Sequence, residues 1–79
     1  MTKEKIYKTI LAKLNEMGYK NKSIDKNTNI FIDLGLDSLD AVELTMSLEQ
    51  EFGIKIPDEE INNMVTIKDV IEIVNKLVK

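Results

Sequence analysis

Ser38 is the first candidate for a reactive residue in this 79-residue chain. It carries a hydroxyl group, and two aspartates lie close to it in the sequence, Asp37 and Asp40. The chain has no histidine and no cysteine, and therefore neither the commonest general base nor a thiolate. Activating the Ser38 hydroxyl would need a lysine or carboxylate in a water-excluded site, and the two aspartates would disfavour an alkoxide or oxyanion. We therefore expect no catalytic residue and no enzyme. The other serines, Ser23 and Ser47, lie in a polar stretch and in the middle of an expected helix.

The acids around Ser38 also raise the question of a metal site. The group consists of Asp33, Asp37, Asp40 and Glu43. Its spacing lacks the alternating ligands and the central glycine of a calcium loop. We expect no dedicated metal site, and weak cation binding to this acidic surface stays open.

The element that must position Ser38 is a helix within Gly35–Phe52, here called the central helix. Asp37 is expected as its N-cap, with Asp40 completing an aspartate variant of the capping box, so that Ser38 takes the first helical position. Gly53 is expected to end the helix in the left-handed conformation. At about 100° per residue, one face of this helix suits a core. That face carries Ala41, Leu44, Thr45, Leu48 and Phe52.

A second face of the central helix has no evident structural use. Residues 33–60 contain nine acids and one lysine, whereas residues 1–32 contain seven lysines and three acids. We therefore expect this face to dock onto a basic protein surface. The alternative is that the central helix buries both of its apolar faces. The docking face, as we call it, consists of Asp37, Leu39, Asp40, Val42, Glu43, Met46 and Glu49.

The rest of the chain predicts three further helices. An amphipathic helix is expected before Gly18, with apolar residues at Ile6, Tyr7, Ile10, Leu11 and Leu14 and its lysines on a solvated face. A short helix is expected near residues 57–63, with Pro57 at its first position. The T-x-x-D pattern of Thr66 and Asp69 predicts the start of the last helix.

The long connection Tyr19–Leu36 is the main irregular segment. A connection of this length is often functional in a compact domain. We expect its late apolar group to pin its end onto the helices, with a short strand as the alternative. This group is Ile30, Phe31, Ile32 and Leu34. The predicted fold is an all-α, small four-helix bundle, three longer helices plus one short helix, with a long loop between the first and second helices.

Composition narrows the class of protein. A net charge of −3 argues against nucleic-acid binding. We expect no signal peptide, and the sequence contains no apolar run long enough to span a bilayer. We expect a cytoplasmic, monomeric protein of one domain, residues 1–79, without stable membrane insertion.

The run LGLDSLDAVELTMSLEQEFGIKIPDEE, Leu34–Glu60, resembles the acyl carrier proteins of dissociated, bacterial-type fatty acid synthesis. The D-S-L signature at residues 37–39 matches the attachment motif of that family. D-S-L alone is a weak signal, but its flanking residues make it highly specific. These are Leu34 and Gly35 before it, and Glu43, Leu44, Glu49, Phe52, Ile56 and Pro57 after it.

The resemblance implies a carrier. Ser38 would receive 4′-phosphopantetheine from coenzyme A through a holo-acyl-carrier-protein synthase, a phosphopantetheinyl transferase, which makes the chain a phosphoprotein. The thiol of this arm would carry the growing acyl chain as a thioester. The implied partners are the enzymes of fatty acid biosynthesis: ketoacyl synthases, reductases, a dehydratase, and malonyl and acyl transferases. A polyketide, peptidyl or D-alanyl carrier, or an unmodified helical interaction module, remains the alternative.

The resemblance also implies an acyl-chain cavity between the central, short and last helices. Its expected lining is Ala41, Thr45, Leu48, Ile56, Ile61 and Met64. The alternative is that these residues are ordinary core and that the acyl chain lies along the surface.

Overall fold

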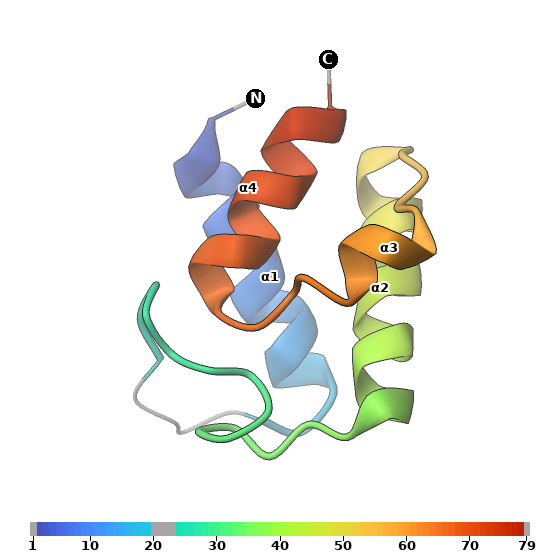
Figure 1. Cartoon of the computed structure of the whole chain (residues 1–79). Helices are drawn as coiled ribbons and strands as arrows, with labels where there is room; N and C mark the ends of the chain where they lie inside the picture. The colour runs from blue at the N-terminus through green and yellow to red at the C-terminus, as the bar shows by residue number, and fades with distance from the viewer. Residues whose placement is uncertain (1, 20–23, 79) are drawn as a thin grey trace.

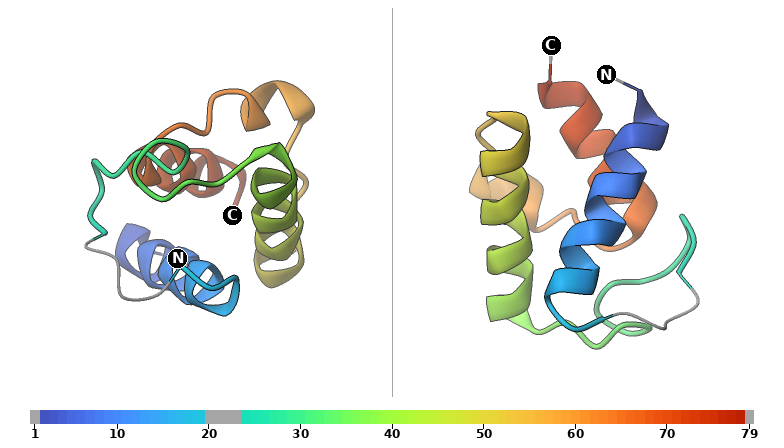
Figure 2. Two further views of the ribbon diagram at one scale, coloured as in Figure 1. Left: turned by 90° about the horizontal axis from the view of Figure 1, so that it is seen from below. Right: turned by 180° about the vertical axis from the view of Figure 1, so that it is seen from behind.

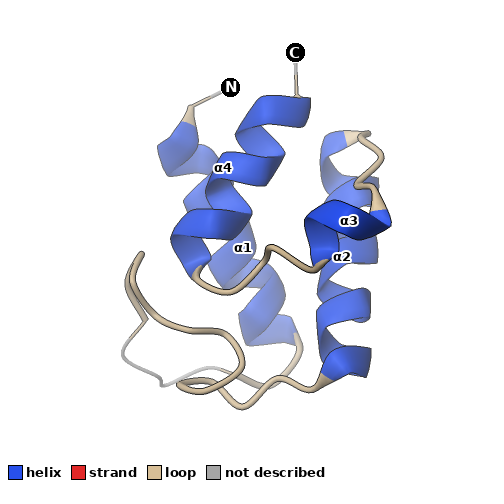
Figure 3. Ribbon diagram, viewed as in Figure 1, coloured by secondary structure: helices blue, strands red, loops and turns tan. Residues whose placement is uncertain are grey.

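The chain forms four helices and an extended connection in the computed structural model, which describes residues 2–19 and 24–78 (Figure 1). The helices are α1 (Lys3–Glu16), α2 (Ser38–Phe52), α3 (Asp58–Ile61) and α4 (Ile67–Leu77). The predicted all-α bundle of three longer helices and one short helix is confirmed, as is the long loop between the first two (Figure 3). Residues 20–23 of the expected loop, Ser23 among them, lie outside the described residues.

The core lies where the three longer helices meet. α1 packs against both α4 and α2, and α2 contacts α3. α2 and α4 run in the direction opposite to α1 (Figure 2). The core face predicted for α2 is confirmed, with Phe52 half-buried at its end and the other four residues buried. Fully buried side chains come from all three longer helices: Ile6, Ile10, Leu14, Leu44, Leu48, Ile67, Val70 and Val74. Across the described residues, no helix combines the length and apolar composition needed to cross a bilayer.

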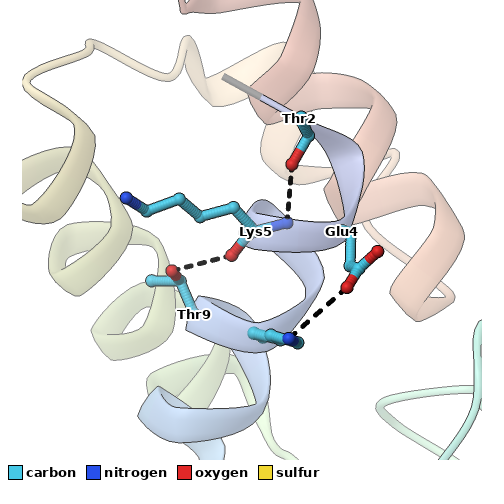
Figure 4. A network of polar contacts seen from close by, with 5 residues as sticks. Thr2, Glu4, Lys5 and Thr9 are labelled. Atoms are coloured by element: carbon cyan, nitrogen blue, oxygen red, sulfur yellow. Dashed lines mark hydrogen bonds and ion pairs between the residues drawn. The ribbon is translucent and has the colours of Figure 1, made fainter.

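The N-terminal half of α1 is organised by local polar contacts (Figure 4). The Thr2 hydroxyl accepts a hydrogen bond from the amide of Lys5 at 3.2 Å and caps the helix. One turn later, the Thr9 hydroxyl donates to the carbonyl of Lys5 at 2.9 Å. An ion pair of 3.4 Å joins Glu4 to Lys8 on the exposed surface.

Two lysines of α1, which were predicted to lie on a solvated face, form ion pairs with other helices. Lys3 lies 2.7 Å from Glu72 of α4, and Lys13 lies 3.2 Å from Glu51 of α2. The prediction was incomplete because it considered only charges within one helix. Each pair links α1 to a neighbouring helix, although exposed pairs of this kind add only about 0–1 kcal/mol to stability.

The ends of α3 and α4 follow from their capping residues. The predicted capping box of α4 is confirmed: Asp69 donates its amide to the Thr66 hydroxyl at 3.2 Å and accepts the Thr66 amide at 3.0 Å. Pro57 is the N-cap of α3 and not its first helical residue, because its ψ of 149° is extended. An ion pair between Glu60 and Lys76 links α3 to the last turn of α4.

The end of the long connection pairs with the segment between α3 and α4. The amide of Ile30 donates to the carbonyl of Val65 at 2.9 Å, and a single antiparallel bridge joins Asn29 to Thr66. It is the only β-bridge within the described residues. The short strand considered as an alternative is therefore limited to a single bridged pair.

The expectation that the whole apolar group of this connection anchors it was wrong for two residues. Ile30 and Leu34 are buried, but Phe31 is 37% and Ile32 82% exposed. The cause is a tight turn in which the Asn29 side-chain oxygen accepts the amides of both Phe31 and Ile32 at 2.9 Å. The turn reverses the chain, so the two residues at its outer side cannot reach the core.

Candidate functional site

Ser38 is the first residue of α2, and a capping box fixes the backbone around it. The Asp37 carboxylate accepts the amide of Asp40 at 2.8 Å, and the Asp40 carboxylate accepts the amide of Asp37 at 3.4 Å. Both halves of the predicted box are therefore present. At the other end of α2, Gly53 has the predicted left-handed conformation, with φ +64°. The cap leaves the Ser38 side chain exposed at the end of a four-turn helix.

The backbone next to Ser38 offers donors for an anion. The amides of Ser38 and Leu39 precede the first intrahelical hydrogen bond, which Ala41 donates to Asp37. Neither amide has a hydrogen-bond partner among the described residues. Free N–H groups and the positive end of the helix dipole together suit a phosphate group. A phosphodiester on the Ser38 oxygen therefore fits the residues that surround it.

Tyr19 also belongs to this site, and sequence reasoning missed it. Its hydroxyl donates a hydrogen bond of 2.6 Å to Oδ2 of Asp40. This bond, partial burial and the negative charges of Asp40, Asp37 and Glu43 raise the pKa of Tyr19 from 10.0 to about 12. Tyr19 lies just after the end of α1, and nothing in the local pattern around Ser38 points to it.

The apolar part of the docking face is exposed. Leu39, Val42 and Met46 are 77%, 45% and 56% accessible to solvent. They follow one another at helical spacing downstream of Ser38 and form an apolar strip along α2. The central helix therefore does not bury both of its faces, and a strip of this kind is unusual unless another molecule covers it.

The four acids of the docking face differ in what they contact. Asp37 and Glu43 are exposed, and no ion pair involves Glu43 within residues 2–19 and 24–78. Asp40 is half-buried and bonded to Tyr19. Glu49 is also half-buried, and its carboxylate accepts the amide of Ile56 at 2.8 Å. Of these acids, Glu43 alone has a side chain with no ion pair or hydrogen bond within the described residues, whereas Asp37 caps α2 and Glu49 contacts the segment that leads into α3.

The residues expected around an acyl chain fall into two groups. Thr45, Ile56 and Ile61 line a groove of about 440 Å³ between α2 and the segment that leads into α3. Ala41, Leu48 and Met64 are buried and do not line it. Thr45 joins the two groups, because its hydroxyl donates to the Ala41 carbonyl at 2.8 Å and lies 3.7 Å from the Met64 sulfur. The groove is also lined by Val42, Met46, Glu49, Lys55, Pro57 and Asp58.

The acids near Ser38 do not converge on one point. Over the part of the chain that the structure describes, no group of three or more acidic side chains is placed to hold a metal ion. Asp33 is engaged elsewhere, since its carboxylate accepts the amide of Asn29 at 2.8 Å. The arrangement therefore presents a hydroxyl, two free amides and an acidic, apolar helix face.

Comparison with known proteins shows which family shares this arrangement. The family model described as the phosphopantetheine attachment site matches residues 8–74. Among solved structures, the chain is similar to the crystal structure of an acyl carrier protein from Thermotoga maritima, with 37% sequence identity and a TM-score of 0.73. That match covers 89% of this chain and 87% of the other. The family match includes α2, α3 and most of α1 and α4.

Proposed function

Because the chain belongs to the phosphopantetheine attachment-site family of acyl carrier proteins, we propose that it carries the growing acyl chain of fatty acid biosynthesis on Ser38. The family carries the 4′-phosphopantetheine prosthetic group and consists of carriers, not enzymes. A carrier of this family interacts with a phosphopantetheinyl transferase and with acyl-processing enzymes. The fatty acid pathway is our proposal, and it rests on the resemblance of Leu34–Glu60.

The main support for Ser38 as the attachment site is its exposed position at the start of α2. The Ser38 oxygen would form a bond to the phosphorus on the pantetheine side of coenzyme A, the adenosine bisphosphate would leave, and the serine proton would be lost. An exposed hydroxyl at a helix start can enter the active site of another enzyme, and the amides of Ser38 and Leu39 can hold the resulting phosphodiester. When attached, the group supplies a thiol on which an acyl chain is held as a thioester.

We further propose that the docking face brings the partner enzymes to Ser38. Leu39, Val42 and Met46 supply exposed apolar surface, and Asp37 and Glu43 supply negative charge at exposed positions. A basic surface on the partner complements this face. The partners proposed are the holo-acyl-carrier-protein synthase, ketoacyl synthases, reductases, the dehydratase, and malonyl and acyl transferases.

For the acyl chain, we propose entry through the groove beside α3. Thr45, Ile56 and Ile61 would form its walls. Ala41, Leu48 and Met64 are buried in the core, and the long, unbranched Met64 side chain, which touches Thr45, is suited to move aside. Each methylene taken out of water would contribute about 0.8 kcal/mol.

Intact mass tests the proposal. Wild type and Ser38→Ala are incubated with coenzyme A and a phosphopantetheinyl transferase, and both are weighed. A gain of one phosphopantetheine in the wild type alone is expected. A gain that survives in Ser38→Ala would reject Ser38, and no gain in either would favour an unmodified interaction module.

The mass of the protein from its native source then reports the acyl load. A fatty acyl load supports the proposed pathway, and a polyketide, aminoacyl or D-alanyl load replaces it with the corresponding alternative. The single acyl carrier domain of residues 1–79, the monomeric state and the cytoplasmic location stay predictions.

A further inference from the structure

α1 ends in a Schellman motif that fixes the position of Tyr19. The amide of Tyr19 donates to the carbonyl of Leu14 at 3.0 Å, and the amide of Gly18 donates to Asn15 at 3.1 Å. Gly18 has φ +97°, which a residue with a side chain rarely adopts. The Tyr19 ring packs against the hydrophobic core, and its hydroxyl extends to the start of α2.

The hydroxyl of Tyr19 shares one carboxylate oxygen with the cap that holds Ser38. Asp40 Oδ2 accepts from Tyr19 at 2.6 Å and from the amide of Asp37 at 3.4 Å. The shorter of these two bonds is the one from Tyr19, and a hydrogen bond to a charged carboxylate is stronger than a neutral one. Within residues 2–19 and 24–78, no other side chain from outside α2 and its cap hydrogen-bonds to residues 37–40.

We propose that Tyr19 is a positioning residue for the modification of Ser38. Through its hydrogen bond to Asp40, it holds the first turn of α2 in the conformation in which the transferase binds Ser38. The inference rests on the proposed function, because it concerns the reaction at Ser38. Tyr19 touches neither Ser38 nor any reacting atom and acts only through Asp40.

The bond is available throughout the physiological pH range. The pKa of Tyr19 is raised to about 12, chiefly by the hydrogen bond with Asp40, so its hydroxyl keeps its proton. Without that hydroxyl, the Asp40 carboxylate would keep only the long contact with the Asp37 amide. The carboxylate could then turn toward solvent, and the turn that carries Ser38 would open more often.

The chain offers a matched control. Tyr7 is also half-buried, and its hydroxyl also donates a hydrogen bond, but to the carbonyl of Ile24 at 3.2 Å. Tyr7→Phe and Tyr19→Phe therefore make the same chemical change, one away from the cap of α2 and one at it. Neither substitution removes the ring that packs against the core.

Two measurements test the proposal. Amide hydrogen exchange is recorded for Asp40 and Ala41, whose amides are hydrogen-bonded to Asp37, and kcat and KM of the transferase are measured with each full-length variant as substrate. For Tyr19→Phe we expect faster exchange in the first turn of α2 and a kcat lowered by roughly tenfold with a smaller change in KM, because misorientation of a nucleophile slows the chemical step. For Tyr7→Phe we expect wild-type exchange in this turn and a wild-type kcat.

A double-mutant cycle tests the route through Asp40. In an Asp40→Ala background, Tyr19→Phe is expected to have no further effect on kcat. An equal loss in both backgrounds, or equal effects of the two tyrosine variants, would overturn the positioning role. If the wild type is modified and Tyr19→Phe is modified at the same kcat, only this inference fails. If the wild type accepts no group at all, the proposed function fails and this inference fails with it.

Discussion

The carboxylate of Glu49 accepts the backbone amide of Ile56 at 2.8 Å. The bond crosses Gly53, where α2 ends, and links the last turn of α2 to the segment that leads into α3. An acid in the last turn of a helix opposes the helix dipole, which costs about 0.3–1 kcal/mol. Here the cost is offset because the carboxylate satisfies an amide that the buried Ile56 could not expose to water.

Removing the Glu49 carboxylate is therefore expected to lower stability. Glu49→Ala leaves the Ile56 amide without its acceptor and should lower the free energy of unfolding by about 1–3 kcal/mol. Glu49→Gln, which keeps an acceptor oxygen, should lose less. Glu43→Ala is the control and should stay within about 0.5 kcal/mol of wild type, because Glu43 is exposed. Urea unfolding measures all three, and equal values for Glu49→Ala and Glu43→Ala would show that the bond is not formed in solution.

Glu43 is the acid of the docking face best suited to steer a partner. Glu43→Lys should slow association with the transferase and reduce the dependence of the rate on salt, while the fold is retained. Glu4→Lys makes the same charge change on α1 and should affect the rate much less, because Glu4 lies at the end of the bundle away from the start of α2 (Figure 1). Stopped-flow association rates across ionic strength decide the matter. Equal slowing by the two variants would mean that only net charge matters.

The two apolar faces of α2 should respond differently to truncation. Leu48 is fully buried, and Leu48→Ala should lower the free energy of unfolding by about 2–5 kcal/mol. Met46 is 56% exposed, and Met46→Ala should cost less than about 1 kcal/mol while weakening partner binding. Thermal melts and binding to the transferase are measured for both variants. If Met46→Ala destabilised the chain as much as Leu48→Ala, Met46 could not belong to the docking face.

The raised pKa of Tyr19 predicts a loss of stability at high pH. The pKa rises from 10.0 to about 12 on folding, so folding favours the protonated hydroxyl. The stabilisation is complete below pH 10 and is lost as pH rises toward about 12. The lysines also titrate in this range, and the comparison of wild type with Tyr19→Phe removes their common contribution. The difference in unfolding free energy between the two proteins should shrink between pH 10 and 12, and a constant difference would contradict the prediction.

The same group can be observed directly. The chain has two tyrosines, so Tyr7→Phe leaves Tyr19 as the only one. Ultraviolet absorbance of the phenolate in this variant should show a midpoint near 12 while the chain is folded. A midpoint at the ordinary value of 10.0 would mean that the bond to Asp40 is absent.

An acyl chain bound in the groove should stabilise the loaded protein. Each buried methylene contributes about 0.8 kcal/mol, so a medium-length chain should raise the melting temperature above that of the form with the bare arm. Chemical shifts of Thr45, Ile56 and Ile61 should change on acylation, because these residues line the groove. A chain that stays on the surface would change neither quantity.

Local rules made the starts of α2 and α4 predictable from sequence. The capping boxes of α2 and α4 each depend on two residues three positions apart, Asp37 with Asp40 and Thr66 with Asp69. The buried face of α2 followed from helical periodicity alone. These features need no knowledge of the neighbouring elements, so the fold class and the setting of Ser38 could be inferred.

The contacts of the acids could not be inferred in the same way. Tyr19 and Asp40 are 21 positions apart in the sequence. Their hydrogen bond forms only because the fold brings the end of α1 and the start of α2 to the same end of the bundle (Figure 1). Glu49 bonds to a backbone amide, which leaves no charge signal in the sequence. Ile32 was misjudged because its exposure depends on how the Asn29 turn reverses the chain, and not on its apolar side chain.

The ion pair between Lys3 and Glu72 has a practical consequence for handling the molecule. It holds the beginning of α1 beside α4, and the last turn of α4 ends close by, at the end of the bundle away from Ser38 (Figures 1 and 2). A resin, an affinity tag or a fluorescent label attached beyond α1 or α4 would therefore leave the start of α2 facing outward. A short linker could also join these two ends in a circularly permuted chain, with a new opening placed in the long connection.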